Sequence, residues 1–298
     1  MDVYGDSPTI VTVWLSVLPK LSILILLLEI YLQIDSLENY FIISNFNIGD
    51  IFNNLSGNNA LNNLLFISSL LSLIIGTVLG LAQSQIKRLM AYSTISHLGF
   101  ILLALSINTE ESLDSFLFYI VQYTITNLNV FLIILAFNYL LSSLIKNNIV
   151  IKDVKYISEL TNQFEKNPIL TLSFIICLLS MAGIPPFIGF YSKLFVLFSA
   201  ISISEYFISI VAILVSVISA YYYLRIIKVL YTEENKTSNL YQQINVTENN
   251  FISNTKSILT NIHSLIISVI SLFLLLFFLN PVLILTSTRV LSLSLFNY

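Results

Sequence analysis

The sequence predicts an all-α polytopic membrane protein with seven transmembrane helices, one of them broken. Of its 298 residues, 56% are hydrophobic and only 10% are charged, and the mean hydropathy is +0.88. A soluble domain carries about a quarter charged residues, so most of this surface is expected to face lipid. Seven apolar segments reach the length of about 20 residues that a helix needs to cross the hydrocarbon core.

The seven segments predict a single transmembrane domain over residues 1–298. They cover residues 7–33, 60–83, 86–107, 115–144, 167–199, 205–231 and 257–285. The fifth segment contains Gly183-Ile184-Pro185-Pro186. Because proline removes a backbone donor and clashes with the preceding turn, we expect this helix to break near residues 183–186. Irregular backbone at membrane depth needs protein or water around it, so the broken helix is expected inside the bundle.

The distribution of the basic residues predicts the orientation of the chain. Ten of the thirteen bases fall at the connections after the second, fourth and sixth segments: Lys87, Arg88, Lys146, Lys152, Lys155, Lys166, Arg225, Lys228, Lys236 and Lys256. Only Arg289 lies on the other side, and Lys20 and Lys193 fall inside segments. The positive-inside rule therefore puts the N-terminus inside and the C-terminus outside.

Charge and cysteine content exclude several classes of function. The net charge of -3 leaves no basic field to attract phosphate backbones, which excludes nucleic acid as a partner. A lone cysteine, Cys177, cannot form an intrachain disulfide or a thiolate metal site. The sequence has no Gly-rich phosphate loop and no cysteine or histidine cluster with metal spacing, so we expect no cofactor and no metal in this chain.

Lys20 and Lys193 are the candidate proton sites. Lys20 lies about 20 Å from either end of its segment, at 1.5 Å per residue, and a lysine side chain cannot reach that far. Lys193 follows the two prolines by about two helical turns, close to the carbonyl groups that the break frees. Each lysine could be a structural cation paired to an acid or capped by carbonyls. Two lysines on one bundle, one of them beside a break, favour a proton or ion path.

His97 is the third candidate relay residue. It lies in the middle of the third segment, with Ser93, Thr94 and Ser96 around it. A lone imidazole is usually a hydrogen-bonded packing residue, but its titration near neutral pH also suits a relay, and the sequence leaves both readings open.

Two further sets of polar residues are predicted to have structural roles. The first set lies on the fourth segment and is expected to hydrogen-bond to neighbouring helices: Gln122, Tyr123, Asn127 and Asn129. The second set lies at the end of the sixth segment and is expected to form an aromatic belt at the membrane interface: Tyr221, Tyr222, Tyr223 and Arg225.

Three stretches together resemble the antiporter-like membrane subunits of respiratory complex I, most closely the subunit 2 family of NADH:ubiquinone oxidoreductase. They are Asp2-Val-Tyr-Gly-Asp-Ser-Pro with Pro19-Lys20, the run from Ile86 to Phe100, and the run from Ser180 to Phe195. Tyr119, Tyr123, Asn127 and Phe131 fit the same pattern, as does the run from Ser219 to Arg225. The resemblance covers nearly the whole chain.

The resemblance implies half of a fourteen-helix fold built from two inverted repeats of five helices. This chain would hold the last helix of the first repeat, the second repeat and the final helix. Lys20 matches the central lysine of the family's eighth helix, His97 the histidine of the tenth, and Lys193 the lysine of the broken twelfth. These residues would relay protons, coupled to quinone reduction elsewhere in the complex.

The resemblance also implies partners and a location. NADH, FMN, iron-sulfur clusters and ubiquinone would bind to partner subunits, so this chain would belong to a proton-pumping NADH:ubiquinone reductase without a redox site of its own. A split gene would explain the missing first seven helices, which a separate chain would supply. The Ile- and Asn-rich composition suggests organelle coding, hence the mitochondrial inner membrane with the N-terminus in the matrix and the C-terminus in the intermembrane space. The alternatives are a multisubunit cation/proton antiporter and a non-conducting structural subunit.

Overall fold

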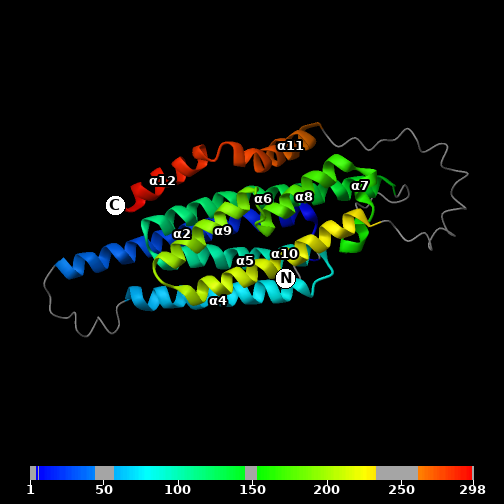
Figure 1. The fold of residues 1–298 in the computed structure, drawn as a ribbon. Helices are drawn as coiled ribbons and strands as arrows, with labels where there is room; N and C mark the ends of the chain where they lie inside the picture. Colours follow the sequence, from blue (N-terminus) through cyan, green and yellow to red (C-terminus); the bar gives the residue numbers. More distant parts are fainter. Residues whose placement is uncertain (1–4, 6, 44–56, 145–152, 233–260, 297–298) are drawn as a thin grey trace, which may run out of the picture.

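The described part of the chain is a bundle of long helices that share one axis (Figure 1). The computed structural model describes residue 5 and residues 7–43, 57–144, 153–232 and 261–296. The Asp2-Val-Tyr element, Lys146, Lys152, Lys236, Lys256 and most of the Asn-rich segments 35–59 and 232–254 therefore lie outside the described residues. Within the described residues the only bridge of β type is the isolated pair Gln85 and Tyr156.

Among the described residues, six helices are long and apolar enough to cross a membrane. Their helical bounds are α2 (Thr9–Ile43), α4 (Gly57–Leu81), α5 (Ile86–Ile107), α6 (Glu110–Leu144), α10 (Tyr206–Tyr231) and α11 (Asn261–Leu276), the apolar span of the last continuing to Leu279. A seventh span is divided into α8 (Pro168–Ala182) and α9 (Ile188–Ser202). The predicted fold class, an all-α polytopic membrane protein with a span broken near residues 183–186, is therefore confirmed.

The helix ends explain where the boundaries differ from the sequence prediction. The fourth span begins at Glu110 rather than at residue 115, because Thr109 and Ser112 cap it reciprocally. The Ser112 backbone nitrogen donates to Thr109 Oγ1 at 3.1 Å, and the Thr109 nitrogen donates to Ser112 Oγ at 2.9 Å. α5 ends at Asn108, which adopts the left-handed conformation that closes a helix.

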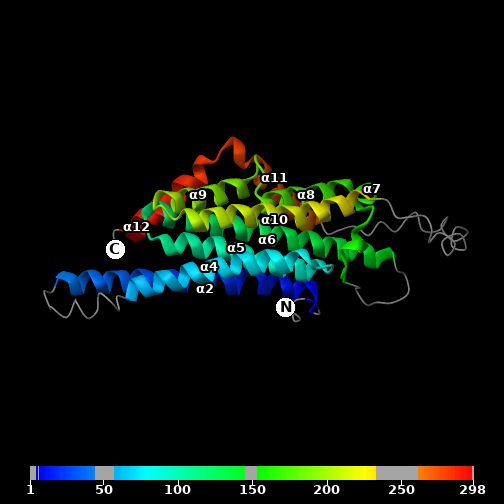
Figure 2. The ribbon, with the colours of Figure 1, turned by 60° about the horizontal axis from the view of Figure 1, so that its bottom comes forward.

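The last span, predicted as one helix over residues 257–285, is interrupted. α11 ends at Leu276, a 3-10 turn (η4) covers Phe277–Leu279, and α12 runs over Val282–Phe296. Pro281 cannot donate a backbone hydrogen bond and so cannot continue α11, which is the physical reason for the difference. Figure 2 shows the segment between α11 and α12 arching away from the neighbouring helices.

α6 is the central helix of the bundle. It packs against α2, α5, α8, α9, α11 and α12. Figures 1 and 2 both show α4 on one side of the bundle and α11 with α12 on the opposite side. Two apolar clusters fill the interior, one that includes Ile86, Phe131 and Phe174, and another that includes Leu103, Phe116 and Val196.

A buried ion pair fixes the end of the bundle at which α2 and α5 begin. Lys87 Nζ donates to Asp153 Oδ2 at 2.7 Å and to the Ser7 carbonyl oxygen at 2.8 Å. Asp153 also accepts from the Thr9 backbone nitrogen at 3.2 Å and from Asn138 Nδ2 at 3.1 Å. Lys87 is only 3% exposed. It is therefore more than the boundary charge of the sequence prediction, because it joins α2 and α5 to the segment before η1 (Ile157–Leu160).

Candidate functional site

Lys193 closes the break between α8 and α9. The last turn of α8 leaves carbonyl groups without helical partners, and Lys193 Nζ donates to two of them, Met181 O at 3.1 Å and Ala182 O at 2.8 Å. The side chain is 6% exposed. An ammonium group at this end of α8 is also favourable to the helix dipole. The carbonyl capping that the sequence analysis considered for this lysine is therefore present, and it is compatible with either a structural or a proton-carrying role.

Two glycines give the break its shape. Gly183 has φ of +81°, and a Cβ there would lie 2.8 Å from Lys193 Cδ. A Cβ at Gly189, in the first turn of α9, would overlap the Ser180 carbonyl oxygen. Both positions therefore need glycine, the first for its backbone conformation and the second for the close approach of α9 to α8.

The break between α8 and α9 is only partly enclosed by the bundle: the helix ends that flank it are buried, and the two prolines are not. Met181, Ala182 and Ile188 are buried, whereas Pro185 and Pro186 are exposed. The expectation that the whole break is enclosed was wrong for the two prolines. They have no backbone N–H, so their exposure leaves no donor uncovered, and the free carbonyl groups of α8 turn inward to Lys193.

Lys20 lies on α2, where its side chain is partly exposed. Its Nζ is 3.5 Å from the hydroxyl of Tyr123 on α6. One turn towards the start of α2, Asn127 Nδ2 donates to the Ser16 carbonyl oxygen at 3.5 Å. The interface between α2 and α6 is therefore polar next to Lys20.

His97 lies between two tyrosines from other helices. Its Nδ1 is 2.8 Å from the hydroxyl of Tyr119 on α6, and its Nε2 is 3.1 Å from the hydroxyl of Tyr223 on α10. His97 is 4% exposed, and both tyrosines are fully buried. Both ring nitrogens therefore have hydrogen-bond partners inside the protein.

Aromatic side chains connect the three predicted residues. The Tyr123 ring, whose hydroxyl faces Lys20, lies 5.5 Å from the His97 ring. On the other side, the Tyr119 ring stacks on Phe100 with centroids 6.0 Å apart, and Lys193 Nζ lies 5.6 Å from the Phe100 centroid. Aromatic contacts thus connect His97 to both lysines, through Tyr123 to Lys20 and through Tyr119 and Phe100 to Lys193.

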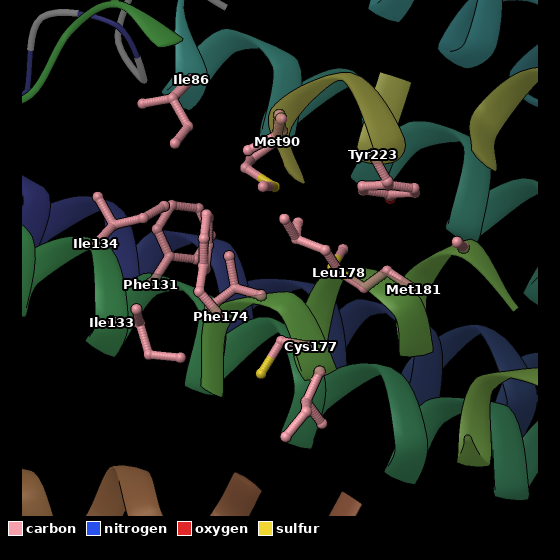
Figure 3. Close-up of a cluster of buried hydrophobic side chains, with 14 of the residues drawn as sticks. Ile86, Met90, Phe131, Ile133, Ile134, Phe174, Cys177, Leu178, Met181 and Tyr223 are labelled. Carbon is pink, nitrogen blue, oxygen red and sulfur yellow. The ribbon is translucent and has the colours of Figure 1, made fainter. Parts of the chain in front are cut away.

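Tyr223 has a role that the sequence does not predict. Tyr221, Tyr222 and Tyr223 were expected to form an interfacial belt with Arg225, but Tyr222 and Tyr223 are buried and, of the three tyrosines, only Tyr221 is exposed. Figure 3 shows Tyr223 among the buried side chains of the first of the two apolar clusters, on the same side of it as Met90 of α5. In the structure the buried residues of α10 recur at three- and four-residue intervals, and Tyr223 follows that pattern. The sequence does not mark this face, because α10 is apolar on nearly all sides.

The polar residues of α6 join neighbouring helices, as the sequence predicts. Ser192 of α9 donates to Gln122 Oε1 at 3.4 Å, and Asn129 Nδ2 donates to Cys177 Sγ of α8 at 3.1 Å. Over the described ranges, no three His, Cys, Asp or Glu side chains gather closely enough to hold a metal ion.

Comparison with known proteins identifies the relatives of this chain. Residues 40–219 match the family model described as "NADH:quinone oxidoreductase/Mrp antiporter, TM", a range that includes His97 and Lys193. NADH-ubiquinone oxidoreductase chain 2 of Rhizopus oryzae is 46% identical over 307 aligned positions, covering 100% of this chain and 55% of the relative. Chain 2 of Arabidopsis thaliana is 32% identical, covering 99% and 50%.

Solved structures share the fold. A chain of respiratory complex I from Thermus thermophilus with bound aureothin matches with a TM-score of 0.57 and 25% identity, covering 75% of this chain and 45% of that one. A chain of the Mrp complex from Dietzia matches with a TM-score of 0.62 and 17% identity, covering 78% and 47%. The present chain spans about half the length of the curated relatives it matches.

Proposed function

The chain belongs to the NADH:quinone oxidoreductase/Mrp antiporter transmembrane family, and on that premise we propose that it is a proton-translocating membrane-arm subunit of NADH:ubiquinone oxidoreductase. The observation that carries the proposal is the placement of Lys193, buried at the break of a membrane helix and bonded to its free carbonyl groups. A buried cation at such a break is costly unless it is satisfied, and such residues commonly mark ion or proton paths.

Lys20, His97 and Lys193 are proposed to relay the proton. His97 lies between the lysines, linked to each side through Tyr123 and Tyr119. Low-dielectric surroundings penalise the charged form of an ionisable group, so residues of this kind can exchange protons that a surface lysine would hold. The proton would move between the three residues through the polar groups and water between them.

The redox chemistry is proposed to belong to other subunits. NADH, FMN, iron-sulfur clusters and ubiquinone would bind there, and this chain would respond to quinone reduction through the relay. Three relatives that match over nearly the whole chain are NADH-ubiquinone oxidoreductase chain 2 proteins of the eukaryotes Rhizopus oryzae, Oenothera berteroana and Arabidopsis thaliana. We therefore place the protein in the mitochondrial inner membrane, with its N-terminus in the matrix and its C-terminus in the intermembrane space, as the basic residues predict.

A separate chain is proposed to supply the other half of the subunit. Lys20 is partly exposed on α2, and a lysine at membrane depth does not face lipid. A helix of that second chain would cover it. Helices that span a bilayer associate without a covalent link, so dividing the subunit into two chains carries little penalty in free energy. Cross-linking from Leu18→Cys, which is exposed on α2, should capture that chain in the purified complex; capture of lipid alone would contradict it.

A multisubunit cation/proton antiporter is the second candidate, because the fold also matches the Mrp complex. The purified assembly in sealed vesicles separates the two. NADH oxidation that drives proton uptake without sodium supports the first proposal, and sodium-dependent proton exchange without NADH oxidation supports the second. Lys20→Met in the assembled complex should lower proton uptake per NADH; unchanged uptake would favour a non-conducting structural subunit.

A further inference from the structure

His97 has an environment that differs from those of the two lysines. It lies in the middle of α5, eleven residues after Ile86 and ten before Ile107. Both of its ring nitrogens meet tyrosine hydroxyls, Tyr119 at 2.8 Å and Tyr223 at 3.1 Å, on opposite edges of the ring. All three side chains are buried, so the hydroxyls have few competing partners.

The chemistry of these groups allows two equivalent hydrogen-bond patterns. A neutral imidazole donates from one nitrogen and accepts at the other, whereas a phenol hydroxyl can do either. In one pattern Tyr119 donates to Nδ1 while Nε2–H donates to Tyr223. In the other pattern every direction is reversed and the imidazole has the opposite tautomer. Both patterns satisfy both ring nitrogens without an extra charge.

We propose that Tyr119 and Tyr223 take part in the relay themselves, by holding His97 neutral and by passing the proton to and from its two ring nitrogens. The inference rests on the proposed proton-translocating function and names two residues that the relay needs. The Tyr119 hydroxyl proton forms the new N–H bond at Nδ1, while the Nε2–H bond breaks and its proton goes to the Tyr223 oxygen. A proton from water forms a new O–H bond at Tyr119 as its own proton leaves, Tyr223 gives up its original hydroxyl proton to water, and His97 ends with as many protons as it had.

The surroundings of the two tyrosines give the relay two distinct ends. Tyr119 stacks on Phe100, over which the Lys193 ammonium group lies. Tyr223 of α10 lies against Tyr222, with ring centroids 4.5 Å apart. The Tyr119 side of His97 therefore faces the α8–α9 break, and the Tyr223 side faces the interface between α5 and α10.

Phenylalanine variants test this inference, because they remove a hydroxyl and keep the ring. In the assembled complex, Tyr119→Phe and Tyr223→Phe should each lower the rate of proton uptake coupled to NADH oxidation about tenfold, the rate equivalent of one lost buried hydrogen bond. The matched control is Tyr31→Phe, which removes another buried tyrosine hydroxyl, bonded to Asn62 Oδ1 at 2.7 Å. It should assemble equally well and pump normally.

The effects should also depend on His97, which a purely structural role would not require. In a His97→Asn background, Tyr119→Phe and Tyr223→Phe should cause no further loss, since all three residues serve one path. Additive losses in that background would overturn the inference, as would single variants that pump like Tyr31→Phe while Lys193→Met is impaired. Normal pumping by all of these variants, Lys193→Met included, would instead reject the proposed function itself.

Discussion

The two interrupted helices of this chain differ in what meets the free ends of their backbone. Between α8 and α9, the carbonyl groups of Met181 and Ala182 turn into the bundle and bind the Lys193 ammonium group. Between α11 and α12, the hydrogen bonds that the described residues make come from the backbone and from Thr286. There Phe278 and Leu279 point outward, 56% and 75% exposed.

This contrast indicates what makes a broken helix a candidate proton site. Proline interrupts both helices, so the interruption alone does not distinguish them. The distinguishing features are a buried cation at the break and the two glycines that let α8, α9 and Lys193 fit together. We expect substitutions at the first break to have large effects and those at the second to have small ones.

The largest effect is expected from Gly189→Ala. The added Cβ would overlap the Ser180 carbonyl oxygen, which is backbone and cannot move aside, so α9 would separate from α8. Overpacking of this kind costs about 3 kcal/mol or more, and native gels should show little assembled complex. Gly80→Ala is the control, because its Cβ would make an ordinary contact 3.5 Å from Tyr222. Equal assembly of the two variants would contradict the close approach of α8 and α9.

Gly183→Ala should have an intermediate effect. Alanine in the left-handed conformation costs about 1–2 kcal/mol, and its Cβ would displace the flexible Lys193 side chain from the carbonyl groups. We expect a complex that assembles with a lowered Tm and pumps fewer protons per NADH. A lowered Tm with normal pumping would show that the position of Lys193 does not matter to transport.

The sequence alone predicts the break between α8 and α9, because the two adjacent prolines and the lysine two turns later lie close together along the chain. It missed the second break, since a single proline in an apolar run does not reveal whether the flanking segments form one helix or two. It also missed the roles of Tyr223 and Lys87, each of which depends on a partner from a distant part of the chain. These membrane helices are apolar on nearly all sides, so the sequence gives little indication of which face meets which neighbour.

Pro281→Ala is expected to have the smallest effect. It would restore a backbone N–H where α11 is interrupted, in the segment that arches away from the neighbouring helices (Figure 2). We expect the free energy of unfolding to change by less than about 0.5 kcal/mol, seen as a nearly unchanged Tm. A loss of assembly comparable to that of Gly189→Ala would mean that the second break matters as much as the first.

The proton-to-electron ratio of the assembled complex, measured for Lys193→Met beside Pro281→Ala, tests the central claim most directly. Methionine keeps most of the length of the lysine side chain and removes its charge and its three donors. The account predicts a clearly lower ratio for Lys193→Met and the unaltered ratio for Pro281→Ala. If both variants assemble and their ratios are equal, the buried lysine at the α8–α9 break does not carry protons.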